Sequence, residues 1–264
     1  MTLTSRRNYP IAKKGSKLIA PKDDGVYYQI WKTGRWETKL NVELSKWCNF
    51  SSQEGKTAFI DIGANFGANS LQISNLTNFQ VDFILVEPLK INVKSLRENL
   101  IEMSEVREIR IESFALSEQT GTAQIYTQKN HFGNTSLYLD EKNETISEIV
   151  ETRSSLDFFI DLDRKYQFLV IKIDTQGSEP IILSSIPDNI WDKIVALTLE
   201  VEPRVDQEPE KILQVVKCLG KFENIFWDES KKIVNLKDVT DFWLLGSGSR
   251  NLMCSKIPNS SLKK

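Results

Sequence analysis

Three short segments of the sequence carry side chains that could bind or transform a ligand. Residues 61–67 read DIGANFG, residues 87 and 88 are Glu-Pro, and residues 172–179 read KIDTQGSE. Each segment ends or directly follows an apolar run of strand length. Ligands of open α/β sheets bind beyond the carboxyl ends of the strands, so we expect these segments to meet in one site.

The first segment predicts a tight turn from a strand into a helix. Asp61 lies in the apolar run, and Gly63 and Gly67 lack side chains, which lets the backbone approach a ligand closely. A dinucleotide fingerprint would read G-x-G-x-x-G, whereas this turn has G-x-x-x-G with Asn65 inside it. A ligand with an amino-acid end suits the turn better than a pyrophosphate, because Asp61 can accept from an ammonium group and loop amides can hold a carboxylate.

Glu87 and Asp174 end two further apolar runs. A carboxylate at Glu87 can accept two hydrogen bonds from a ribose diol, which together with the first turn favours S-adenosylmethionine over NAD. Lys172 and Asp174 share one strand face because side chains alternate, and either could contact a substrate hydroxyl. The structural alternatives are a solvated strand-end acid at Glu87 and an ion pair between Lys172 and Asp174.

Strand and helix patterns alternate from residue 57 onward. We expect strands over residues 58–62, 81–86, 109–114, 168–174, 194–201, 222–227, 242–245 and 252–255. We expect helices over residues 69–76, 91–103 and 208–219 and from residue 180. A hairpin arm is expected over 122–127, and residues 128–148 are expected to be irregular. This alternation predicts an α/β protein with a mainly parallel central sheet and helices on both faces.

Residues 1–55 differ in composition from the remainder, which we predict to be one domain over 56–264. The segment is dense in aromatic residues, namely Tyr27, Tyr28, Trp31, Trp36 and Trp47. We expect an N-terminal extension that packs these rings on the main domain. A lid over the substrate is the alternative.

Composition excludes several classes of protein. With 264 residues, 40% hydrophobic and 27% charged, the chain is typical of globular domains. A formal net charge of −2 gives no basic excess for nucleic acid, and the apolar runs are too short for a membrane span. Cys48, Cys218 and Cys254 form no CxxC pair, which argues against a zinc site or a disulfide framework and predicts a cytoplasmic location.

The segments FIDIGANFGANSL, VEP, ALSEQTGTA, GNTSL, SLDFFI, VIKIDTQGSEPIIL and LTLEVEP occur in this order. Over about residues 57–203 they resemble the FkbM-type family of S-adenosylmethionine-dependent methyltransferases. The resemblance implies a Rossmann-like class I methyltransferase fold with an antiparallel last strand, and S-adenosylmethionine as cofactor. The cofactor site that it implies consists of Asp61, Gly63, Ala64, Asn65, Gly67, Ser70, Glu87, Pro88, Phe114 and Ala115. It places the GNTSL stretch, with Asn134 and Ser136, near the acceptor side, where Lys172 is expected from its strand face.

Methyl transfer from a sulfonium is an in-line displacement, so the enzyme mainly aligns the acceptor, the methyl group and sulfur. A hydroxyl acceptor also loses a proton, and Asp174 is the first candidate base. His131, the only histidine, is the second. Asp174, Glu200 and Glu202 could form a magnesium site, but we expect no required metal.

The expected acceptor is a small molecule or glycan that is methylated on a hydroxyl oxygen. A sugar is favoured by the range of acceptors that the resemblance implies, and the polar stretch around His131 is consistent with a polyhydroxyl substrate. A peptide side-chain nitrogen is the alternative acceptor. A cofactor-binding module without catalysis and a dehydrogenase are the alternatives to a methyltransferase.

Overall fold

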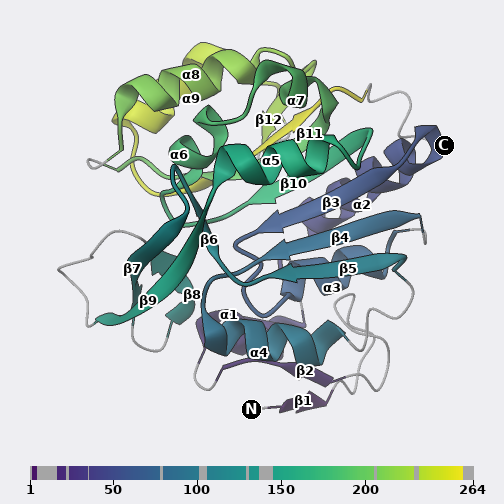
Figure 1. The fold of residues 1–264 in the computed structure, drawn as a ribbon, viewed down its shortest axis with the longest axis vertical. Coiled ribbons are helices and arrows are strands. Elements are labelled where there is room, and N and C mark those ends of the chain that lie inside the picture. Colours follow the sequence, from purple (N-terminus) through teal and green to yellow (C-terminus); the bar gives the residue numbers. More distant parts are fainter. Residues whose placement is uncertain are drawn as a thin grey trace.

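The computed structural model describes residues 2–4, 17–21, 24–34, 36–77, 80–100, 106–128, 131–136, 145–204, 207–228 and 232–257. Within these residues a seven-stranded sheet has the order β12-β13-β11-β10-β3-β4-β5 (Figure 1). Its strands are β3 (Thr57–Ile62), β4 (Val81–Val86), β5 (Glu108–Glu112), β10 (Phe168–Ile173), β11 (Ile194–Val201), β12 (Asn224–Trp227) and β13 (Arg250–Ser255).

Only β13 runs antiparallel to its neighbours β11 and β12, while the strands from β11 to β5 pair in parallel. The predicted mainly parallel sheet with an antiparallel last strand is therefore confirmed. The central strands β3 and β4 are buried along their whole length, which explains their nearly continuous apolar sequences.

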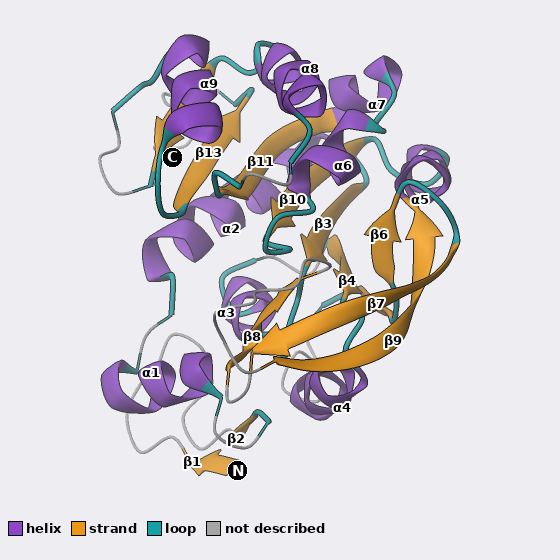
Figure 2. Ribbon diagram, turned by 90° about the vertical axis from the view of Figure 1, so that its left-hand side faces the viewer, coloured by secondary structure: helices purple, strands orange, loops and turns teal. Residues whose placement is uncertain are grey.

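Helices cover both faces of the sheet (Figure 2). One face carries α2 (Thr38–Glu54), α3 (Ala68–Ser74) and α4 (Lys90–Asn99). The other carries α5 (Ser155–Asp163), α6 (Glu179–Ser184), α7 (Asp188–Lys193), α8 (Pro209–Leu219) and α9 (Leu236–Leu245). Strand alternation divides the core accordingly: Ile60 faces the second group, whereas Phe59 packs with α2. No described helix is long and apolar enough to cross a membrane.

The N-terminal residues form α1 (Gly25–Thr33) as well as α2. In α1 the Asp24 side chain caps the first turn, and Gly34 ends the helix at φ 67. Leu44 and Trp47 of α2 are buried in the same apolar cluster as Phe59. The domain boundary at residue 55 stays a prediction, but α2 packs directly on the central sheet. A two-stranded sheet, β1 (Thr2–Thr4) with β2 (Lys17–Ile19), precedes these helices.

A second sheet lies beyond the carboxyl ends of β3, β4 and β5 (Figure 1). It consists of β6 (Ala115–Ser117), β9 (Thr145–Ser154), β7 (Gly121–Gln128) and β8 (His131–Ser136), in that spatial order. The hairpin arm expected over 122–127 is confirmed as part of β7. The expectation of an irregular segment over 128–148 is wrong, because β8 and the start of β9 lie there. Residues 137–144 lie outside the described part of the chain.

Two further expectations need correction. Residues 242–245 were expected as a strand, but they end helix α9. Val239 and Trp243 lie one helical turn apart on its buried face, and the Asn235 side chain caps its first turn by accepting from Asp238 N at 2.8 Å. The helix expected over 91–103 ends as α4 at Asn99, and residues 101–105 lie outside the described ranges.

Candidate active site

A cavity of about 210 Å³ lies at the carboxyl ends of β3, β10 and β11. It unites the first and third polar segments of the sequence with residues of β11 and of the N-terminal helices. The lining residues are Val26, Trp36, Glu37, Gly63, Ala64, Asn65, Ala68, Asn69, Lys172, Asp174, Gln176 and Glu200. The structure therefore brings together five of the predicted site residues, namely Gly63, Ala64, Asn65, Lys172 and Asp174.

Gly63 makes the turn after β3 possible. It has φ +82, and a β-carbon at this position would lie 1.9 Å from the carbonyl oxygen of Asp174. The amides of Gly63 and Ala64 both donate to the carbonyl oxygen of Val86, at 2.9 and 3.0 Å. A side chain at Gly63 would therefore separate the ends of β3 and β10, which both border the cavity.

The remaining amides of this turn are also used within the chain. Asn65 N donates to Glu87 Oε2 at 2.9 Å, Phe66 N to Asn65 Oδ1 at 2.8 Å, and Gly67 N to Ala64 O at 2.9 Å. Every amide from Gly63 to Gly67 thus already has an acceptor, which differs from the expectation that these amides hold a ligand carboxylate. The turn can therefore offer a ligand a complementary shape, but the backbone amides of residues 63–67 are not free donors.

Lys172 is the buried cation of the site. It pairs in register with Asp61 across β10 and β3, and its Nζ lies 3.5 Å from Asp61 Oδ1 and 3.4 Å from Asp174 Oδ2. Ser70 donates to the other Asp61 oxygen at 2.5 Å. Burial alone would lower the pKa of Lys172, but the carboxylates of Asp61, Asp174 and Glu37 outweigh it and raise the pKa, so the ammonium stays charged.

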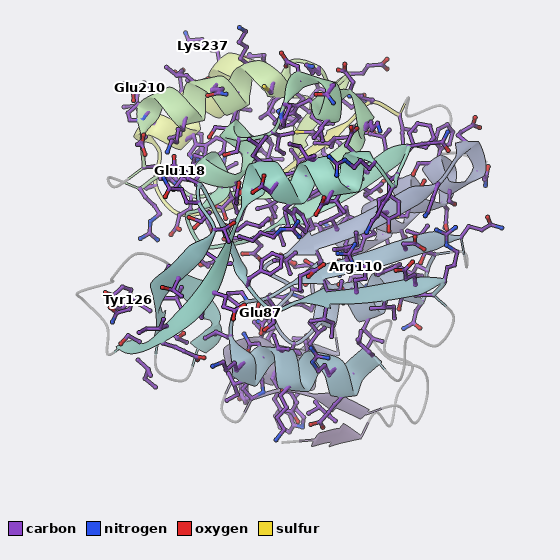
Figure 3. All side chains as sticks on the ribbon, viewed as in Figure 1. Glu87, Arg110, Glu118, Tyr126, Glu210 and Lys237 are labelled. Atoms are coloured by element: carbon purple, nitrogen blue, oxygen red, sulfur yellow. The ribbon has the colours of Figure 1, made fainter. Side chains whose placement is uncertain are left out.

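Glu87 lies between the end of β4 and α4 (Figure 3). Its Oε2 accepts from Asn65 N, while its Oε1 accepts from Leu89 N at 2.9 Å and Asn92 Nδ2 at 3.3 Å. Burial raises the pKa of Glu87 to about 7, although these N–H donors act against the rise. The carboxylate therefore ties the glycine turn to α4, and its contact with a ribose stays a prediction.

Asp174 and Glu200 share a donor at the end of the neighbouring strands β10 and β11. Gln176 Nε2 donates to Asp174 Oδ1 at 2.8 Å and to Glu200 Oε2 at 2.6 Å. Burial, and then the charge of Asp174, raise the pKa of Glu200 to about 8. The predicted magnesium option gains no support, since no group of three metal-binding side chains occurs among the described residues.

The loop that carries Gln176 is shaped by Glu179. The buried Glu179 carboxylate accepts from Thr175 N at 2.7 Å, Thr175 Oγ1 at 2.8 Å and Gly177 N at 2.9 Å. Gln176 adopts φ 56 between these bonds, a conformation that few side-chain-bearing residues take. The KIDTQGSE segment thus combines the buried anchor Glu179 with three residues that line the cavity, Lys172, Asp174 and Gln176.

Sequence reasoning gave no site role to Trp36, Glu37 or Asn69. Asn69 Nδ2 donates to Glu37 Oε2 at 2.7 Å, and Trp36 Nε1 donates to Asn69 Oδ1 at 3.1 Å. Burial is the main cause that raises the pKa of Glu37. The positive charge of Lys172 opposes this rise, and the negative charge of Asp174 adds to it. Trp36 and Glu37 lie outside every quoted motif, and the aromatic density of the first 55 residues was the only signal for them, whereas Asn69 lies in the FIDIGANFGANSL segment.

The other predicted residues are not among the described residues that line this cavity. Phe114 and Ala115 are half-buried; the Phe114 ring packs against Phe158 at 6.2 Å between centroids, and Ala115 begins β6. Pro88 is half-buried beside Glu87. His131, Asn134 and Ser136 belong to β8, and their side chains lie outside the described part of the structure. Their predicted roles, including that of His131 as a base, stay predictions.

Comparison with known proteins gives one family. Residues 61–224 match the model of the methyltransferase FkbM domain. No curated protein is similar enough in sequence to match the chain.

The fold is also similar to solved structures at low identity. An O-methyltransferase from Bacillus cereus in complex with SAH is 8% identical with a TM-score of 0.45, covering 90% of this chain and 94% of that one. The O-methyltransferase TomG from Streptomyces achromogenes in complex with SAM is 9% identical with a TM-score of 0.45, covering 89% and 88%. Aeropyrum pernix fibrillarin with bound S-adenosyl-L-methionine is 9% identical with a TM-score of 0.40, covering 75% and 66%.

Proposed function

The chain belongs to the FkbM methyltransferase family, and from this premise we propose that it transfers a methyl group from S-adenosylmethionine to a hydroxyl oxygen of a sugar or glycan. The observation that carries the proposal is the charge of the cavity. Glu37, Asp174 and Glu200 line it as acids, and Lys172 is the one basic residue among its described lining residues. A positive sulfonium would be attracted to these carboxyl groups, and its charge would favour the ionised forms of Glu37 and Glu200, whose pKa values are raised by burial.

The residues at the strand ends fit this cofactor in shape as well. Gly63 lets the ends of β3 and β10 approach each other closely at the cavity, and Asp61 Oδ1 is buried with no hydrogen bond, its contact being the ion pair with Lys172. Residues 63–65 would border the cofactor, and the acids would lie around its charged end. When bound, S-adenosylmethionine supplies a methyl group already activated for transfer.

The chain's own contribution to the reaction is alignment and removal of a proton. The acceptor hydroxyl would give its proton to the Asp174 carboxylate as its oxygen takes up the methyl group that S-adenosylmethionine would supply. Lys172 and Gln176 hold the two Asp174 oxygens in place, which fixes the direction from which the acceptor approaches. Such alignment can contribute on the order of 7–11 kcal/mol to lowering the barrier, and a positioned base about 10²–10⁴-fold in rate.

The polar lining supports a polyhydroxyl acceptor. Glu37, Asn69, Gln176 and Glu200 offer acceptors and donors of hydrogen bonds, and Trp36 adds an aromatic surface. This mixture suits a sugar better than an apolar substrate.

The test is incubation of the purified protein with S-adenosylmethionine and a panel of monosaccharides, nucleotide-activated sugars, oligosaccharides and peptides. We expect one sugar to gain the mass of one methyl group, on oxygen by NMR. Methylation of a peptide nitrogen would replace the sugar assignment. If calorimetry shows cofactor binding but neither the panel nor cell extracts yield a methylated product, the protein would be a binding module. Preference for NAD over S-adenosylmethionine would indicate a dehydrogenase.

A further inference from the structure

Part of the cavity wall comes from residues that precede the family match. Trp36 and Glu37 lie between α1 and α2 and border the same cavity as Asp174, whereas the matched region begins at residue 61. The family assignment therefore gives these two residues no role.

Hydrogen bonds from three elements hold this short connection. Besides the two bonds through Asn69 of α3, Asn251 Nδ2 of β13 donates to Glu37 Oε1 at 3.2 Å, and Asn41 Nδ2 of α2 donates to the Trp36 carbonyl oxygen at 3.1 Å. Glu37 adopts φ 42 and ψ 39, a left-handed conformation that few side-chain-bearing residues take. The fold thus fixes Glu37 at the cavity in an unusual backbone conformation.

The chemistry of the pair suits a sugar ring. An ionised carboxylate has about four acceptor positions, and two of those of Glu37 are used by Asn69 and Asn251. The others can accept hydrogen bonds from a ligand in the cavity. The half-buried indole of Trp36 has its N–H engaged with Asn69, which fixes the orientation of the ring; the ring packs against the apolar cluster around α2 and also lines the cavity, where it offers apolar surface.

We propose that Trp36 and Glu37 form the acceptor subsite for a pyranose. The indole ring packs on the C–H face of the sugar, Glu37 accepts from one of its hydroxyl groups, and a neighbouring hydroxyl meets Asp174. The inference rests on the proposed function. The arrangement of the chain supports it independently, because α1, which ends just before Trp36, packs against β8. This strand contains the predicted acceptor residues Asn134 and Ser136 and the candidate base His131.

The test measures sugar binding directly. The probes are the methyl glycosides of glucose, galactose, mannose and rhamnose, added to the protein saturated with S-adenosylhomocysteine and observed by saturation-transfer NMR. We expect the wild type to saturate the ring protons of at least one glycoside. Trp36→Ala and Glu37→Gln should reduce that signal at least fivefold, whereas Trp36→Phe should keep most of it because the ring remains.

Matched controls isolate the subsite. Trp31→Ala removes an indole that is 56% exposed in α1 and does not line the cavity, and Glu54→Gln neutralises an exposed acid at the end of α2. Both should leave the glycoside signal unchanged. All variants should bind S-adenosylmethionine within twofold of the wild type by calorimetry, which also shows that they are folded.

Three results would overturn the inference. In the first, the wild type binds S-adenosylmethionine but none of the glycosides. In the second, the Trp36→Ala and Glu37→Gln variants keep the glycoside signal. In the third, these variants lose more cofactor affinity than glycoside signal. The third result would assign Trp36 and Glu37 to the cofactor. A wild type that fails to bind S-adenosylmethionine would instead contradict the proposed function and remove the inference with it.

Discussion

The α-carbon of Gly63 lies so close to the carbonyl oxygen of Asp174 that a β-carbon on it would be 1.9 Å from that oxygen. The ends of β3 and β10 are therefore in direct backbone contact, and the position of Asp174 depends on the absence of a side chain at Gly63.

Gly63→Ala should lower the free energy of unfolding by at least about 3 kcal/mol, because it adds a steric overlap with backbone to the cost of φ +82. Gly248→Ala is the matched control, since Gly248 has φ +73 and no heavy atom within 4 Å of the added carbon. The control should lose only about 1–2 kcal/mol. Urea denaturation measures both, and equal losses would contradict the close contact.

Lys172→Met should destabilise the protein by about 3–5 kcal/mol, because it leaves the fully buried Asp61 carboxylate without its cation. Lys46→Met removes a surface ion pair with Glu43 and should cost no more than about 1 kcal/mol. Adding Asp61→Asn to Lys172→Met should restore part of the loss in chemical denaturation. A double variant that is less stable than Lys172→Met would argue against the buried charge as the cause.

Asp174→Asn should keep cofactor affinity within a few-fold and lower kcat by about 10²-fold or more, because the amide cannot take a proton from the acceptor. Asp157→Asn, at an exposed site in α5, is the control and should leave turnover unchanged. His131→Ala tests the other candidate base. If His131→Ala abolishes turnover and Asp174→Asn does not, the base is His131; a raised KM with unchanged kcat would make Asp174 a binding residue.

Glu200 predicts a pH dependence of stability. Its pKa is raised from 4.5 to about 8 by burial and by Asp174, so the folded protein holds this proton more tightly than the unfolded chain. The resulting stabilisation is fully present below pH 4.5 and is lost as the pH rises to about 8, on the order of a few kcal/mol.

Urea denaturation across this pH range checks the sign. Glu200→Gln should reduce the loss of unfolding free energy between pH 4.5 and 8. Part of that loss should persist in the variant, because burial also raises the pKa of Glu87 to about 7. Glu202→Gln, whose carboxylate pairs with Arg204 at 3.3 Å, is the neighbouring control and should keep the wild-type profile. Stability that rises over the range in the wild type would contradict the assignment.

Leu44→Ala should cost about 2–5 kcal/mol, because Leu44 is fully buried between α2 and the sheet. Leu213→Ala, on the half-exposed face of α8, should change stability by less than about 1 kcal/mol. Thermal unfolding measures the pair. A small effect at Leu44 would mean that the N-terminal helices are dispensable for the domain.

The sequence was most informative where one physical cause dominates. The strand over residues 81–86 and the strand over 194–201 have the predicted bounds, because continuous apolar runs specify buried parallel strands. The strand prediction for residues 242–245 is wrong because a four-residue apolar run is too short to distinguish a helical period from a strand period. The helix becomes evident only when Asn235 is recognised as its cap and Val239 as the buried residue one turn earlier.

The site divides in the same way. Gly63 and Asp174 could be found from the turn and the strand ends, since local geometry alone demands them. Glu37 could not, because its place at the cavity depends on hydrogen bonds to Asn69 and Asn251, which are distant in sequence. Nor could the occupied amides of Gly63, Ala64 and Asn65, because their acceptors, the Val86 carbonyl and the Glu87 carboxylate, are brought there only by tertiary packing.

The hydrogen bond between Asn251 and Glu37 also constrains the order in which parts of the protein can form during synthesis. β13 lies between β11 and β12, so β12 has no place in the sheet until β13 has inserted. While the ribosome still holds residues 250–255, a nascent chain has neither the completed sheet nor the amide that fixes Glu37. The part of the cavity wall that Glu37 forms can thus reach its final arrangement only after β13 has been synthesised and has inserted between β11 and β12.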